Sequence, residues 1–105
     1  MIKVSVLYPR TEGARFDHEY YRSRHVPMVA ELVGSAVTAW GVERGLNGGA
    51  PNAPAVYEAA CWFEVETEEA WAAGFGPNAD QILGDIANYT DITPVMQVSE
   101  VTATG

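Results

Sequence analysis

The order of strands and helices along the chain restricts its fold more than any other feature of the sequence. Residues 2–8 alternate between apolar and polar side chains and are rich in β-branched residues, a pattern that predicts a strand. Comparable patterns predict further strands over residues 37–46, 55–65 and 92–101, and helices over residues 17–34 and 67–87. This strand–helix–strand–strand–helix–strand order is that of the ferredoxin-like α+β fold. We therefore expect a single domain over residues 1–105, with an antiparallel four-stranded sheet and both helices on one face.

The sheet face away from the helices predicts self-association. Whichever face the second and third strands bury, their other face still carries tryptophan or several aliphatic side chains. If these strands pair Trp40 with Trp62, both indoles lie on one face. An exposed apolar sheet face is an association surface, and two such sheets packed face to face form a closed dimer. We therefore expect a homodimer.

The charge distribution argues against several classes of partner. All six Lys and Arg residues lie at or before Arg44, so residues 1–52 carry six basic and five acidic side chains, and residues 53–105 carry nine acidic and no basic ones. Nucleic acids and anionic membranes are bound by clustered basic side chains, so neither is expected as a partner. There is no long apolar run and no signal-peptide pattern, so we expect a cytoplasmic protein. The single Cys61 is expected to be a small buried hydrophobic residue.

The segment 16–28 holds both histidines and is the part of the sequence that most resembles a chemical site. On a helix, four residues here and in the next turn lie within about 60° of one another, namely Tyr21, His25, Met28 and Leu32. The stripe is otherwise apolar, so it is expected to face the core. Histidine titrates near neutrality, which suits an inward His25 to acid–base chemistry. The alternative is a core histidine whose ring is satisfied by a hydrogen bond. Pro27 has no N–H to donate, so it is expected to break or restart the helix just after His25.

Other kinds of chemistry have weaker support in the sequence. Two histidines and one cysteine are too few for a recognisable metal site. No glycine-rich fingerprint follows the first strand and no nucleophile occupies a recognisable turn, so no cofactor is expected. The candidate polar companions of His25 are Tyr20, Tyr21, Asn78 and Tyr89, around an aromatic pocket that suits a hydrophobic or aromatic small molecule. The Gly/Pro-rich loop 47–54 is either a lid or partner contact, or a tolerated surface insertion.

Three motifs in the same order give the chain a resemblance to a known family. They are Tyr20-Tyr21 with His25-Val26-Pro27-Met28, then Arg44-Gly45-Leu46 before the Gly/Pro loop, then Asp85-Ile86-Ala87-Asn88-Tyr89 with Pro94-Val95. Together they resemble the EthD-like family, named for a protein of ethyl tert-butyl ether degradation that accompanies a cytochrome P450 system. The resemblance implies a dimeric α+β barrel, in which two ferredoxin-like protomers close a barrel between their sheets.

The same resemblance bears on the site. Wider relatives of the barrel include cofactor-free monooxygenases, polyketide cyclases, muconolactone isomerases and haem-degrading enzymes, whose ligands usually sit between the sheet and helices of each protomer. It implies that His25 and Pro27 line that cleft. Many members carry a histidine at the position of Asn78, so the resemblance leaves Asn78 only an orienting or hydrogen-bonding role.

Three functions are expected from the pocket and the resemblance. The first is a cofactor-independent enzyme of organic-compound degradation or secondary metabolism, of isomerase, cyclase or monooxygenase type, with His25 and Tyr21 as catalytic residues. The second is a non-catalytic accessory or carrier protein for a cytochrome P450-type oxygenase system. The third is haem binding or an oxidoreductase role through His25. The residues expected to contact a ligand are Tyr20, Met28, Trp40, Trp62, Phe75, Asn78 and Tyr89.

Overall fold

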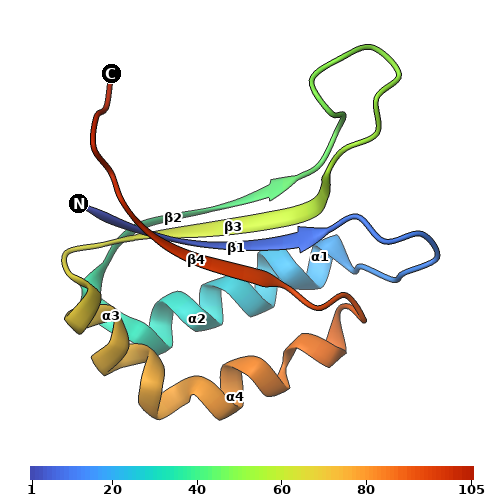
Figure 1. Cartoon of the computed structure of the whole chain (residues 1–105). Coiled ribbons are helices and arrows are strands. Elements are labelled where there is room, and N and C mark those ends of the chain that lie inside the picture. Colours follow the sequence, from blue (N-terminus) through green and yellow to red (C-terminus); the bar gives the residue numbers. More distant parts are fainter.

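A computed structural model describes all 105 residues as a sheet covered on one face by helices (Figure 1). The strands are β1 (Ile2–Pro9), β2 (Val37–Arg44), β3 (Tyr57–Val65) and β4 (Val95–Glu100). The helices are α1 (His18–Tyr20), α2 (Val26–Val33), α3 (Glu68–Phe75) and α4 (Ala79–Gly84). A π-helical turn over Tyr21–His25 joins α1 to α2, and 3₁₀ turns cover Gly34–Ala36, Gly76–Asn78 and Ile86–Asn88.

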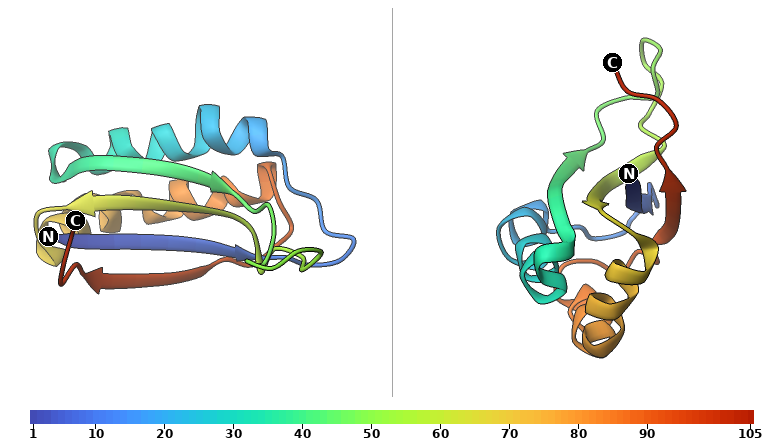
Figure 2. Two further views of the ribbon diagram at one scale, coloured as in Figure 1. Left: turned by 90° about the horizontal axis from the view of Figure 1, so that it is seen from above. Right: turned by 90° about the vertical axis from the view of Figure 1, so that its left-hand side faces the viewer.

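The sheet confirms the ferredoxin-like topology. The strand order is β2-β3-β1-β4, and each neighbouring pair is antiparallel. Figure 2 shows all four helices on the same side of this sheet. Strand β1 extends one residue beyond the predicted range, and the other three strands are two to four residues shorter than predicted. For example, β4 begins at Val95 and not at Ile92, directly after Pro94, which has no N–H to give to a strand ladder.

The two tryptophans of the central hairpin lie on opposite faces of the sheet. The register places Trp40 opposite Phe63 and Trp62 opposite Gly41, so the pairing of Trp40 with Trp62 considered from the sequence is wrong. Trp40 lies on the helix side, at the edge strand β2. The Trp62 ring lies on the bare face over Gly41, where a Cβ atom would come within 2.5 Å of the indole. The Lys3 ammonium lies 5.5 Å from the centre of the same ring.

The helices form two adjacent rows, which we call the first helical layer (α1 to α2) and the second helical layer (α3 to α4). The first helical layer contains a local irregularity that changes which residues are fully buried. Its ends are as predicted: Asp17 caps α1 by accepting a hydrogen bond from the Tyr20 amide, and Gly34 ends α2 with a φ of 88°. Between them, the amide of Val26 bonds the carbonyl of Tyr21, five residues back. The wider turn inserts one extra residue before α2. The regular helix restarts at Val26, next to Pro27, as expected.

The extra residue corrects the predicted inward stripe. Tyr21 and His25 are buried as expected, at 0% and 5% exposure. Beyond the π-turn, however, the fully buried positions are Val29 and Val33, while Met28 and Leu32 are half-buried and pack against the core. A regular helix repeats every 3.6 residues, whereas the π-turn needs more residues per turn, so the buried positions continue at intervals of four.

The second helical layer packs against the first at Gly74, where α3 approaches α2. Thr67 caps α3 by accepting a hydrogen bond from the Ala70 amide. At Gly74, a Cβ atom would lie 2.5 Å from the carbonyl oxygen of Val33, so the close approach of α3 to α2 depends on this glycine. The Trp71 ring lies between Phe63 of the sheet and Phe75, with ring centres 5.3 and 5.4 Å away.

Two segments extend from the sheet on the side opposite the helices. Figure 1 shows that the loop between β2 and β3 and the last residues of the chain both rise from this side. The loop therefore does not cover the space between the sheet and the helices of its own protomer. No helix has the length and apolar character needed to cross a membrane.

Candidate functional site

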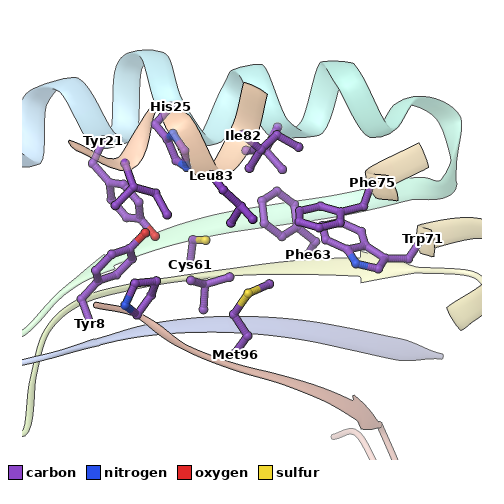
Figure 3. Close-up of a pocket in the computed structure, with 14 residues that line it drawn as sticks. Tyr8, Tyr21, His25, Cys61, Phe63, Trp71, Phe75, Ile82, Leu83 and Met96 are labelled. Atoms are coloured by element: carbon purple, nitrogen blue, oxygen red, sulfur yellow. The ribbon is translucent and has the colours of Figure 1, made fainter. Parts of the chain in front are cut away.

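A small apolar cavity lies between the sheet and the helical layer (Figure 3). It has a volume of about 30 Å³. Strands β1, β3 and β4 and helices α2, α3 and α4 contribute to its lining, as do the turns beside them. The lining residues are Val6, Tyr8, Tyr21, His25, Val29, Cys61, Phe63, Trp71, Phe75, Ile82, Leu83, Ile86, Pro94 and Met96. Leu83 and Met96 are 48% and 46% exposed, so the cavity reaches the surface between α4 and β4.

His25 contributes an imidazole to this cavity and is held by an acidic residue from the other helical layer. Its Nδ1 atom lies 2.8 Å from Oδ2 of Asp85. The other carboxylate oxygen, Oδ1, accepts hydrogen bonds from the Tyr20 hydroxyl at 2.7 Å and from the Asn88 amide at 2.9 Å. The carboxylate is thus fixed by three donors, and its position fixes the imidazole. The Nε2 atom makes no hydrogen bond within the chain and is available to a ligand.

Arg15 anchors the segment that follows Asp85. Its guanidinium donates to the carbonyl oxygens of Ala87 and Asn88, and its backbone amide donates to the carboxylate of Asp91. The Thr90 hydroxyl donates to the Arg15 carbonyl at 2.6 Å. Because these contacts join the loop before α1 to the end of the second helical layer, they hold the two layers that supply His25 and Asp85 in one relative position.

The environment of the pair favours a neutral imidazole beside a charged carboxylate. Burial lowers the pKa of His25 below its usual value, although the hydrogen bond and charge of Asp85 act in the opposite direction. Burial alone would raise the pKa of Asp85, but its hydrogen bonds with His25, Asn88 and Tyr20 bring it below the usual value. Near neutral pH, therefore, Nδ1 carries the proton that bonds Asp85, and Nε2 carries a lone pair.

Two buried tyrosines pack on the imidazole, and a third, Tyr8, contacts both of them. The His25 ring is stacked on the Tyr21 ring, with centres 5.8 Å apart, and its centre lies 4.6 Å from that of Tyr89. The Tyr8 and Tyr89 hydroxyls are hydrogen-bonded to each other at 2.5 Å. Burial raises the pKa of Tyr8 to about 12 and raises those of Tyr21 and Tyr89 further. All three phenols are therefore uncharged at neutral pH.

Comparison with known proteins identifies the family. A search of protein-family models finds no match. An EthD-like protein from Ralstonia eutropha JMP134, solved by crystallography, is 53% identical, with 97% of this chain and 92% of that chain covered and a TM-score of 0.93. The chain belongs to the EthD-like family.

Two further proteins are similar to this EthD-like chain. An uncharacterized 11.0 kDa protein in the thcB–thcC intergenic region of Rhodococcus erythropolis is 32% identical over 90 residues, which are 85% of this chain and 84% of that protein. A dimeric ferredoxin-like protein of unknown function from Thermobifida fusca is 14% identical, with 95% and 90% of the two chains covered and a TM-score of 0.59, and shares the fold alone.

The predicted site residues of this EthD-like protein fall into three groups by position. His25, Tyr21 and Phe75 line the cavity. Tyr20 and Tyr89 do not line it, but Tyr20 bonds the carboxylate that holds His25, and Tyr89 packs on the His25 ring.

The remaining four predicted residues lie away from the cavity. The Asn78 amide donates to the carbonyls of Leu32 and Gly74, so it joins the two helical layers. Met28 faces Gln81 outside the cavity because of the π-turn. Trp40 is 41% exposed at the sheet edge, and Trp62 lies on the bare face.

The main residue missed by sequence reasoning is Asp85. It belongs to the family motif, but the sequence gives it no role, because 60 residues separate it from His25 and no local pattern joins them. The spacing of Asp85, Asn88 and Tyr89 within one turn was the available signal. Tyr8 and Cys61 were also missed, although their alternation with Val4 and Phe63 placed them on the buried face of the sheet.

Proposed function

We propose that this EthD-like protein binds a hydrophobic or aromatic small molecule between its sheet and helices and carries out cofactor-independent acid–base chemistry on it with His25. The observation that supports this most is the buried His25, with one nitrogen held by Asp85 and the other free at an apolar cavity. Small-molecule sites are typically apolar cavities with a few well-placed polar groups.

The chemistry expected of this pair is proton transfer at Nε2. The neutral imidazole accepts a proton from the ligand, and the Asp85 carboxylate stabilises the imidazolium that forms. The proton returns to another atom of the ligand or of the product. Asp85 does not touch the ligand in this scheme, and we regard it as a positioning residue that sets the tautomer and orientation of His25.

The cavity has to widen to admit such a ligand. A benzene-sized molecule needs a cavity of roughly 150 Å³, whereas the volume in this structure is about 30 Å³. The half-exposed side chains of Leu83 and Met96 stand at the mouth and have room to turn outward. The helix α4, six residues long between two 3₁₀ turns, is the element expected to move with them.

We also propose that two copies associate through their bare sheet faces. Leu7, Ala60 and Val95 are adjacent on this face by register, and the Trp62 ring covers its centre. The fold neighbour from Thermobifida fusca is described as dimeric. By register the same face also carries Lys3, Glu64 and Gln97, so its apolar part is a patch around Leu7, Ala60 and Val95. An uncovered sheet face with such a patch is suited to a second copy of itself.

The test is a thermal-shift screen of aromatic, lactone and ether compounds on the wild type and on two variants. His25→Asn keeps a donor in the position of Nδ1 and removes Nε2. The matched control is His18→Asn, because His18 lies outside the cavity and bonds Glu58. A ligand raises the melting temperature by mass action. We expect hits in the wild type and in His18→Asn that are weakened or lost in His25→Asn.

Turnover assays on the hits separate the two main functions. Chemical conversion by the wild type and not by His25→Asn is the expected result. Compounds that raise the melting temperatures of His25→Asn and His18→Asn equally would contradict the role of His25. Tight binding without conversion would favour the carrier function.

A further inference from the structure

One hydroxyl at the cavity has no hydrogen-bond partner. Tyr21 is fully buried, and its hydroxyl oxygen is the only buried side-chain nitrogen or oxygen atom of the chain left unpaired. Its polar neighbours are the Cys61 thiol and the Tyr8 hydroxyl, and it forms a hydrogen bond of good geometry with neither. Figure 3 shows the Tyr8 and Tyr21 hydroxyls at the same end of the cavity. Because an unpaired buried hydroxyl costs stability, its persistence at a cavity indicates a partner that the chain does not supply.

The Tyr21 hydroxyl is suited to donate rather than to accept. Burial raises its pKa far above neutrality, so it keeps its proton. The Tyr8 hydroxyl is already engaged with Tyr89, and burial raises the pKa of the Cys61 thiol to about 12, so both neighbours are neutral and the thiol is a weak acceptor. An oxygen atom of a ligand is a stronger acceptor than the thiol and fits the Tyr21 hydroxyl.

The free nitrogen of His25 lies on the same wall of the cavity. His25 follows Tyr21 by one turn, and the two rings are stacked with an angle of 14° between their planes. The wall thus offers one donor, the Tyr21 hydroxyl, beside one acceptor, Nε2 of His25. Apart from Tyr8, Cys61 and the indole N–H of Trp71, the other lining residues present only carbon or thioether sulfur atoms.

We propose that the cavity recognises an apolar, ring-sized molecule with a single oxygen function next to an acidic proton, such as a phenol or an enolisable ketone. This inference rests on the proposed function and specifies its substrate class. Tyr21 donates its hydrogen bond to the oxygen, and Nε2 of His25 takes the proton. The electron pair of the broken O–H or C–H bond stays on the ligand, and the negative charge is carried by the oxygen that Tyr21 holds. Asp85 balances the imidazolium, and no electrons enter or leave.

Three probes with the same ring separate the parts of this recognition. Phenol has an acceptor oxygen and an acidic proton, anisole has the oxygen alone, and toluene has neither. Dissociation constants are measured by NMR titration of the full chain for the wild type, Tyr21→Phe and His25→Asn. The control is Tyr57→Phe, which removes a hydroxyl from a half-exposed tyrosine of β3 outside the cavity. Each comparison is between two proteins for one probe, so differences in hydrophobicity between the probes cancel.

The expected result is a different pattern for each variant. Tyr21→Phe raises the dissociation constants of phenol and anisole about 3- to 10-fold, the range for loss of one neutral hydrogen bond. It leaves the dissociation constant of toluene unchanged. His25→Asn weakens the binding of phenol alone, and Tyr57→Phe changes the binding of none of the three probes. Since the Tyr21 hydroxyl makes no hydrogen bond of good geometry in the chain, the melting temperature of Tyr21→Phe should equal or exceed that of the wild type.

Two outcomes overturn the inference in distinguishable ways. In the first, toluene binds, but Tyr21→Phe binds phenol and anisole as tightly as the wild type does. The Tyr21 hydroxyl then hydrogen-bonds only a water molecule, and the proposed function stands without this specificity. If none of the three probes binds the wild type, the cavity is not a ligand site for ring-sized molecules, and the proposed function falls with the inference. A marked drop in melting temperature on Tyr21→Phe would also contradict it, because the hydroxyl would then have a partner within the chain.

Discussion

At the scale of single residues, the site depends on how His25 and Asp85 share one proton. The imidazole is buried, and its only hydrogen bond is with a carboxylate that two other groups already hold in place. Burial outweighs the carboxylate, and the pKa of His25 is lowered. A base that is neutral at working pH and backed by a fixed anion is ready to accept a proton, which is the property that the proposed chemistry needs.

The lowered pKa of His25 predicts a pH-dependent stability. The unfolded chain binds a proton at this histidine near its usual pKa of 6.5, whereas the folded chain binds it only at lower pH. Below about pH 6.5 the unfolded state therefore holds more protons, and the folded state loses stability as the pH falls, by at most about 1.4 kcal/mol per pH unit for one group. We expect denaturant unfolding at pH 7 and pH 5.5 to show a smaller loss in His25→Asn than in the wild type.

Comparing the two proteins at both pH values removes the contributions of His18 and of the surface carboxylates, which they share. Asp85 also has a lowered pKa, but its contribution is lost only at pH values below this window. Equal losses in both proteins, or a wild type that gains stability on acidification, would show that His25 is not held neutral by burial.

At the scale of elements, the strands and helix caps were predictable because their signals are local. Alternation fixed the buried face of β1, and Asp17, Thr67 and Gly34 marked helix ends. Met28 and Leu32 pack against the core as predicted, but the fully buried positions beyond His25 are Val29 and Val33. The π-turn changes the helical period, and apart from Pro27 no residue pattern in the sequence indicated that change. The partnership of His25 with Asp85 was not predictable, because it arises only when the two helical layers pack side by side.

Gly34 offers a test of the turn that carries the chain from α2 to β2. Its φ of 88° and ψ of −146° lie in a region that only glycine adopts readily, and a Cβ atom at this position would meet nothing within 4 Å. Gly34→Ala should therefore destabilise the fold by about 1–3 kcal/mol through backbone strain alone.

The matched control is Gly84→Ala at the end of α4, where space is equally open and φ is not positive. It should be neutral or slightly stabilising, because alanine favours a helix more than glycine does. Denaturant unfolding of both variants gives the comparison, and equal stabilities would contradict the strain at Gly34.

At the scale of the whole molecule, one sheet face is covered by helices and the other carries Leu7, Val95 and the Trp62 ring in the open. The loop between β2 and β3 and the C-terminal residues rise on the open side (Figure 1). This arrangement keeps the cavity within one protomer and leaves the bare face open to the second copy that we propose. The fold was predictable from the order of elements, whereas the size of the cavity was not, since it depends on how fourteen side chains pack.

Self-association is tested by sedimentation at micromolar concentration. We expect the 11.3 kDa chain to sediment as a dimer and Leu7→Lys to sediment as a monomer, because the interface would bury a charged lysine in the apolar patch of the bare face. Ala72→Lys, on the exposed side of α3, adds the same charge and should remain a dimer. A wild type that is monomeric throughout this range would contradict the proposed interface.

The most direct test of the central claim is to locate a ligand by methyl NMR. The full chain, labelled at Ile, Leu, Val and Met methyl groups, is titrated with toluene. A site between sheet and helices predicts shifts at Val29, Ile82, Leu83 and Met96, which line the cavity, and none at the exposed Leu46 and Val56 of the loop. Shifts confined to methyl groups outside the cavity, with those four unchanged at saturation, would show that the space beside His25 is not the binding site.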